Sequence, residues 1–278
     1  MLNMMQIIPK NMFYGWIIVG TCWTTSMVSC FMNPVVFSIF IDPMRNDMNV
    51  GLGALAWVMS IRMLSGGLAT PVIGKLLDKY GARWVGSCGG FMAGLSLVGF
   101  YWADNLWSLY LFAFLGGLSG MGVAGGGQLL TTLPVANWFV AKRGRAVAIT
   151  STGMGIGTTI SAPVGLLLIN TIGWRSTWLV FGLIIWLVVI PGYGIFMRRR
   201  PEDVGLLPDG LDNTEKDDED ISHVEKLGQE SHWTVKQALK APVLWLILLS
   251  CSISFGLMIK LSFFNNSFKS NLILRALN

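Results

Sequence analysis

Residues 178–196 read WLVFGLIIWLVVIPGYGIF, a run without a charged side chain. A helix of this length spans the hydrocarbon core of a bilayer, which needs about 20 apolar residues. Similar runs recur along the chain, and charged residues make up only 13% of its 278 positions, against about 25% in soluble domains. Because the runs are apolar on all sides rather than striped, the sequence predicts an all-α integral membrane protein that is embedded in the lipid bilayer.

Six runs are predicted to span the membrane: Trp16–Ile41, Leu52–Leu76, Trp84–Trp102, Trp107–Leu133, Ala146–Ile169 and Trp178–Phe196. A seventh helix is expected from Pro242 to near Ile259. Eleven of the fifteen acids lie between Glu202 and Glu230, which predicts a flexible or weakly helical cytoplasmic linker. The expected domains are therefore a six-helix bundle (1–200), this linker (201–240) and the start of a second bundle (241–278). Beyond Lys260 no clean span follows, so a truncated or frame-shifted gene is expected in preference to a deliberately short protein.

The basic residues predict the orientation. One side of the predicted membrane receives Lys10, Lys75, Lys79, Arg83, Lys142, Arg143, Arg145 and Arg198–Arg200, whereas the other receives only Arg45 and Arg175. Since cytoplasmic loops carry the excess of Lys and Arg, we expect a cytoplasmic N-terminus and a multi-pass protein of the cell membrane, plasma or inner.

Several classes of function are disfavoured by what the spans lack. No basic stripe with interleaved aromatics suggests nucleic-acid binding. The four cysteines (Cys22, Cys30, Cys88, Cys251) have no metal-ligand spacing, and both histidines (His223, His232) fall in the acidic segment. We therefore expect no metal site and no cofactor. An enzyme is also not expected, because no cluster of His, Cys or acids lies at either face.

A ten-residue motif lies between the second and third spans: GKLLDKYGAR, residues 74–83. Gly74 permits close helix approach, and Gly81 can turn the chain with positive φ. Asp78 can accept hydrogen bonds at a helix N-terminus, and Lys79 and Arg83 favour the inner side. The motif resembles the loop signature of the major facilitator superfamily, and the resemblance implies that it latches two bundles in the outward-facing state.

Two further stretches narrow the resemblance. Residues 137–148, NWFVAKRGRAVA, are followed by Gly153, Gly155 and Gly157, and residues 199–210 read RRPEDVGLLPDG. In this order they resemble monocarboxylate transporters and oxalate–formate antiporters. The resemblance implies two inverted three-helix repeats, with helices 1 and 4 lining a central cavity. The first span departs from the animal monocarboxylate transporters, because it lacks the lysine that they carry there for proton and substrate binding.

Arg62 lies near the centre of the second span, where a cation costs about 2.5–3.5 kcal/mol on insertion scales. Ser65, Gly66 and Ala69 share its face at helical spacing, so this face is expected to contact protein or a cavity. No span carries an acid that could pair with Arg62. Two interpretations stay open: Arg62 contacts an anionic substrate, or it has a structural or gating role with helix carbonyls or a group outside this sequence.

Polar residues on helices 1 and 4 complete the candidate substrate site. Helix 1 carries Thr25 and Asn33 on a polar stripe at four-residue steps, and helix 4 carries Gln128. The alternative is ordinary hydrogen bonding between helices. The glycine-rich run 153–157 is interpreted as helix packing, because no strand precedes it as a nucleotide motif requires.

The expected function is secondary active transport of a small organic anion, a mono- or dicarboxylate, by alternating access. A second half-bundle is the partner that this mechanism implies. The alternatives are a non-transporting fragment or accessory half-bundle, and a superfamily transporter of another small solute.

Overall fold

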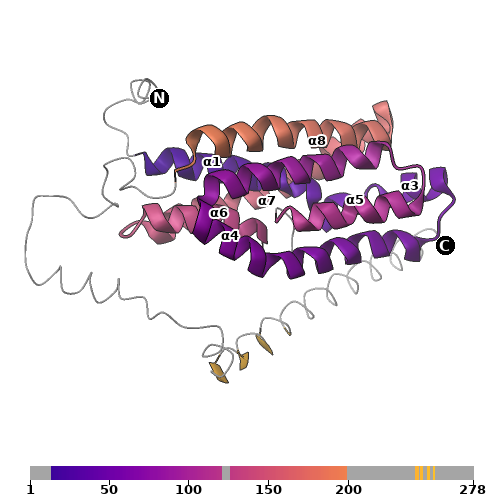
Figure 1. Ribbon diagram of the computed structural model, residues 1–278. Coiled ribbons are helices and arrows are strands. Elements are labelled where there is room, and N and C mark those ends of the chain that lie inside the picture. The colour runs from indigo at the N-terminus through magenta and orange to yellow at the C-terminus, as the bar shows by residue number, and fades with distance from the viewer. Residues whose placement is uncertain are drawn as a thin grey trace, which may run out of the picture. The chain divides into compact units, whose positions relative to one another are not determined.

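The computed structural model describes residues 14–120 and 126–198, together with positions 242, 243, 245, 246, 249, 250 and 253. Contacts divide the chain into two units, Met1–Asp212 and Asn213–Asn278, and the elements below belong to the first. The predicted linker lies outside the described residues, and of the predicted seventh helix only those seven positions are described, all helical. The long helices lie side by side along a common direction (Figure 1).

The second and third predicted spans form one element, α4 (Leu52–Tyr101), which contains a break at Gly81. Gly81 has φ 78° and ψ 165°, a backbone conformation that only glycine adopts without strain. The prediction of a turn at Gly81 is thus confirmed. The prediction of a loop over residues 77–83 is wrong, because helix continues up to this single residue on both sides. The two parts, residues 52–80 and 82–101, each have the length of a span.

The first predicted span is not a continuous helix, so this part of the prediction is wrong. It consists of α1 (Gly15–Ser29), the 3-10 turn η2 (Cys30–Met32) and the short helix α2 (Pro34–Ser38). Asn33 between them is extended, with φ −74° and ψ 143°. Pro34 has no N–H and favours the first position of a new helix, which explains the restart. The predicted outer loop that follows contains a further helix, α3 (Ile41–Met48).

The fourth predicted span is also interrupted. Helix α5 (Leu106–Leu118) ends at Ser119, and Gly120 has a positive φ of 69°. Helix α6 (Gly126–Trp138) follows after the residues that are not described. The prediction of one helix over Trp107–Leu133 is therefore corrected to two helices.

The last two spans are α7 (Arg143–Ile172), and α8 (Trp174–Pro191) with its π-helical end η3 (Gly192–Phe196). Gly173 separates them with φ 83°. By length and apolar composition, the described stretches Gly15–Ser38, Leu52–Tyr101 and Arg143–Phe196 are able to cross a membrane. The latter two each hold two spans divided by a glycine with positive φ. Helices α5 and α6 have 13 residues each, so the six-span bundle stays a prediction that the described helices support.

Glycines bring the helices into backbone contact. A Cβ added at Gly153 or Gly157 of α7 would overlap the carbonyl oxygen of Trp23 or Met27 in α1. On the third span, Gly90 and Gly94 face side chains of α8 instead, those of Val189 and Trp186. Close approach through small residues is how helices pack in lipid, where burial from water supplies no drive. The interpretation of the 153–157 run as packing is confirmed for Gly153 and Gly157, whereas no described atom lies within 4 Å of a Cβ at Gly155.

The pairs of packed helices follow a pattern. Span 1 packs on span 5, span 2 on span 4, and span 3 on spans 4 and 6. Exchange of spans 1–3 with spans 4–6 converts the pairs 1–5 and 2–4 into each other and leaves the pair 3–6 unchanged. These three pairs agree with the predicted inverted repeat, which stays a prediction.

Candidate functional site

Arg62 lies in the first part of α4 and is only 4% exposed. Ser65, Gly66 and Ala69 on the same face are buried with it, which confirms that this face contacts protein. The contact is with α5, because a Cβ added at Gly117 would overlap the Ser65 hydroxyl and the Arg62 carbonyl oxygen. Glycine at position 117 therefore allows the Arg62 turn to lie directly against the α5 backbone.

The interruption in span 1 reaches the same part of α5. The Met32 Cε atom lies 3.2 Å from the position that a Cβ at Gly116 would take. Two consecutive glycines of α5 thus contact two different spans. Gly116 contacts the broken segment of span 1, and Gly117 contacts the Arg62 turn of span 2. Four residues further along, α5 has ended and Gly120 turns the chain. Breaks in two helices and a buried cation are gathered around one stretch of α5.

The charge of Arg62 has no counter-ion in the part of the chain that the structure describes. Its Nη2 atom is buried without a hydrogen-bond partner. The four described acids, Asp42, Asp47, Asp78 and Asp104, are all exposed. A buried cation without a carboxylate partner is costly, so a site of this kind favours an anion from outside the described residues.

Thr25 of α1 is the second candidate with an unused polar atom. It is 2% exposed, and its Oγ1 has no hydrogen-bond partner among the described residues. Its neighbours on the polar stripe bond to their own helix: Thr21 donates to the Ile17 carbonyl at 2.9 Å, and Ser29 to the Ser26 carbonyl at 2.8 Å. A buried hydroxyl is normally satisfied, so Thr25 remains the residue of this stripe best suited to a ligand. Thr25 lies in α1 and Arg62 in α4, and the two side chains are not joined by a contact between described residues.

The other two candidate substrate residues, Asn33 and Gln128, lie outside the Arg62 turn. The Asn33 Oδ1 accepts a hydrogen bond from the Val35 N–H at 3.0 Å and so caps α2; its side-chain oxygen has a structural use that the sequence reading did not include. Gln128 lies in α6, but its side chain is outside what the structure describes. The structure therefore brings Arg62 together with the broken part of span 1 and leaves Gln128 to be placed.

The predicted gating motif lies on both sides of the α4 break. Asp78 and Lys79 are exposed, and the Lys79 ammonium lies 5.2 Å from the centre of the Tyr80 ring. Arg83 is half-buried near Tyr14. No described atom lies within 4 Å of a Cβ built at Gly74, so the close approach that Gly74 was expected to permit does not occur between described residues. A latch between two bundles stays a proposal.

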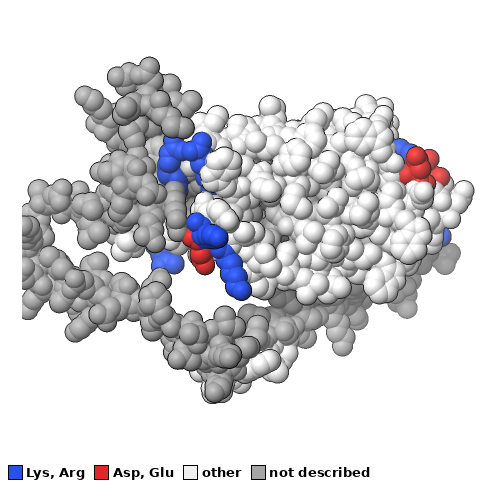
Figure 2. All heavy atoms as spheres, in the orientation of Figure 1, with Lys and Arg blue, Asp and Glu red and all other residues white. Residues whose placement is uncertain are grey.

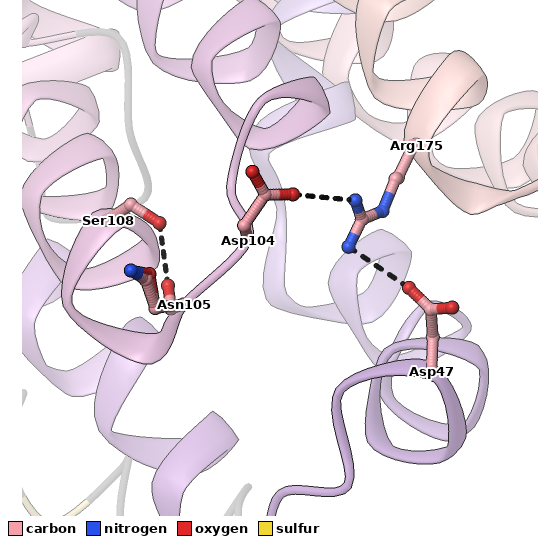
Figure 3. A network of polar contacts seen from close by, with 5 residues as sticks. All are labelled: Asp47, Asp104, Asn105, Ser108 and Arg175. Carbon is pink, nitrogen blue, oxygen red and sulfur yellow. Dashed lines mark hydrogen bonds and ion pairs between the residues drawn. The ribbon is translucent and has the colours of Figure 1, made fainter.

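A polar network at the opposite end of the bundle was not predicted from the sequence (Figure 3). Arg175 of α8 contacts the carboxylates of Asp47 at 3.1 Å and Asp104 at 3.2 Å. Its guanidinium also lies 4.8 Å from the Trp174 ring centre. One arginine therefore ties the start of α8 to α3 and to the loop between α4 and α5. The sequence did contain an indication of this network, because both acids and Arg175 fall on the predicted outer side of the membrane.

We expect this network to contribute only modestly to stability. Exposed ion pairs are worth about 0.2–1 kcal/mol each, and the Asp104 side chain is 84% exposed whereas that of Asp47 is 49% exposed. Asp47→Asn should therefore lower the unfolding temperature in detergent more than Asp104→Asn does. High salt should remove the difference. A larger loss for Asp104→Asn would contradict this ranking.

These features define a class of protein. A bundle of membrane-length helices that carries a buried charge without a counter-ion among its described residues has the properties of a multi-pass transport protein. The family model for the Major Facilitator Superfamily matches residues 22–273, and the chain belongs to this superfamily of transporters.

Curated relatives of the chain are monocarboxylate transporters. Monocarboxylate transporter 3 of Mus musculus is 28% identical over 174 residues, which are 63% of this chain and 35% of the relative. Monocarboxylate transporter 2 of Homo sapiens is 28% identical over 174 residues, with 63% and 36% covered. Monocarboxylate transporter 12-B of Danio rerio is 30% identical over 179 residues, with the same coverage. The match spans about a third of the length of these relatives.

Proposed function

We propose that this chain forms the first half of a secondary active transporter that moves a small organic anion, a mono- or dicarboxylate, by alternating access. The observation that carries the proposal is the buried Arg62, whose Nη2 has no partner within the described residues. An arginine fork matches a carboxylate with two parallel hydrogen bonds. The matched relatives are named for monocarboxylate transport, which agrees with a ligand of this chemistry.

The proposed site combines charge with orientation. Arg62 supplies the positive charge for the carboxylate, and the unused Thr25 hydroxyl is available to orient a further polar group. Asn33 can still donate through its amide nitrogen while its oxygen caps α2. Gln128 is the candidate on the other broken helix. In this scheme the second half of the cavity comes from a second half-bundle, and the motif at Gly74, Asp78, Lys79, Gly81 and Arg83 is the latch between the two.

Uptake of labelled small carboxylates tests the proposal. Cells would express the 278-residue chain, or the chain extended by a second six-helix half. Uptake by the extended chain alone would support the proposed function and show that the cavity needs both halves. Uptake by both would mean that half-bundles assemble into a working cavity. Absence of uptake from both, with the protein present in the membrane, would refute the carboxylate proposal for the compounds used.

Orientation is tested separately by thiol labelling. In a cysteine-free background, Asn105→Cys and Ala141→Cys place single exposed thiols at opposite ends of the bundle. With the N-terminus cytoplasmic, a membrane-impermeant maleimide should label the Asn105→Cys variant in intact cells. It should label Ala141→Cys only after permeabilisation. The reverse pattern would invert the proposed topology.

A further inference from the structure

One end of the bundle carries most of its positive charge, and we call this set the basic rim. Its described members are Lys75, Lys79, Arg83, Lys142, Arg143, Arg145 and Arg198. Asp78 is the one acid described at this end. Figure 2 shows the blue side chains gathered here, whereas the other end shows red beside blue. At that other end the two described cations, Arg45 and Arg175, are outnumbered by Asp42, Asp47 and Asp104, so the excess of positive charge among the described residues lies at the rim.

The rim is assembled from segments distant in sequence. The Tyr14 hydroxyl donates to the Phe196 carbonyl at 2.7 Å, which joins the start of α1 to the end of η3. Burial raises the pKa of the Tyr14 phenol, while the nearby charges of Arg198 and Arg83 act to lower this pKa. The Trp138 indole N–H donates to the Arg198 carbonyl at 3.4 Å. These contacts place the ends of four spans on one surface.

The turn into α7 concentrates the accessible charge. Residues 141–145 are exposed without interruption, and they include Lys142, Arg143 and Arg145. Both arginines lie in the first turn of α7, which contains no acid. A helix N-terminus is itself positive, so cations there are locally unfavourable. An external anion placed against this turn would be attracted by the side chains and by the helix end together.

Aromatic side chains border these charges. Tyr80 is 53% exposed, Trp84 69% and Phe196 44%. Aromatic rings of this kind lie at the boundary between lipid tails and head groups, and Lys and Arg extend from that boundary toward the head groups. The mixture of exposed rings and cations has the composition expected of a surface that touches lipid head groups.

We propose that the basic rim binds the head groups of anionic phospholipids, with the turn at Lys142, Arg143 and Arg145 as the principal contact. Clusters of basic residues beside a membrane-spanning helix attract anionic lipids, and the described part of the rim has seven cations against one acid. The proposal concerns the lipid around the protein rather than the transported solute. It therefore does not depend on the proposed substrate or on the direction of transport.

Lipid selectivity measured by electron spin resonance tests the proposal. The purified chain would be placed in nanodiscs of phosphatidylcholine, with trace spin-labelled phosphatidylglycerol or spin-labelled phosphatidylcholine. We expect phosphatidylglycerol to associate about fivefold more strongly, the effect of about one cation near a charged surface, and the preference to fall as salt is added. The triple variant Lys142→Gln, Arg143→Gln, Arg145→Gln should lose it. Arg45→Gln, a charge removal at the other end, should leave it unchanged.

Two results would overturn the proposal: equal association of both lipids with the unmodified chain, or a preference that the triple variant retains. Thermal unfolding and helix content verify that each variant is folded. If the triple variant does not fold, Lys75→Gln and the single variant Arg145→Gln replace it, since both residues are exposed. Each single variant is then expected to weaken the preference in part, and no weakening in either would count against the rim.

Discussion

Arg62→Gln is expected to reduce carboxylate uptake by about 100-fold while leaving the protein at least as stable to heat. Loss of one partner from a buried charge pair costs about 2–5 kcal/mol, which covers a change of that size. Stability should not fall, because the described chain offers Arg62 no counter-charge and removal of an unpaired buried cation relieves its desolvation cost. Uptake by the extended chain and thermal unfolding in detergent measure the two effects.

The effects on uptake and on thermal stability together distinguish the two roles open to Arg62, contact with the substrate and a structural or gating role. A structural arginine would lower the unfolding temperature when replaced, and uptake would fall as the amount of folded protein falls. Arg62→Lys is the matched variant, since it keeps the charge but loses the planar fork. We expect it to retain part of the uptake. Normal uptake by Arg62→Gln would exclude Arg62 from the substrate site.

Gly157→Leu is expected to destabilise the bundle strongly, whereas Gly155→Leu should be tolerated. A Cβ at Gly157 would overlap backbone atoms of Met27 in α1, but nothing lies within 4 Å of a Cβ at Gly155. Overpacking of this kind costs about 1–3 kcal/mol or more, and backbone atoms cannot move aside as a flexible side chain can. An exposed substitution without such a contact usually stays within about 0.5 kcal/mol.

Thermal unfolding of both variants in the same detergent measures the difference. The two positions share a helix, a residue type and a substitution, so hydrophobicity and helix propensity are matched. Equal unfolding temperatures would mean that α1 and α7 do not pack through Gly157.

The all-helical membrane fold could be predicted because the length of an apolar run is a strong signal. The two helix breaks were not predicted, since each depends on the backbone angles of one residue. Asn33 followed by Pro34 was a readable signal, because Asn favours the cap and Pro the first position of a helix. Gly120 was a weaker signal for a helix break, because many other glycines lie in the same span.

The candidate site was predicted in part. Burial of the Arg62 face could be predicted from the small residues one turn away, and the structure confirms it. The contact of that face with Gly117 could not, because it joins residues more than fifty positions apart. The Arg175 network was missed for the same reason, since its acids come from α3 and from the loop between α4 and α5. Asn33 was assigned to substrate without its capping role, which requires the α2 break to be known.

The most direct test of the central claim is equilibrium binding of a labelled small carboxylate to the purified extended chain and to its Arg62→Gln variant. We expect saturable binding to the unmodified protein, competed by unlabelled carboxylates but not by the corresponding neutral amides, and no detectable binding to the variant. Equal binding to both proteins would contradict the claim that Arg62 is the counter-charge of the transported anion.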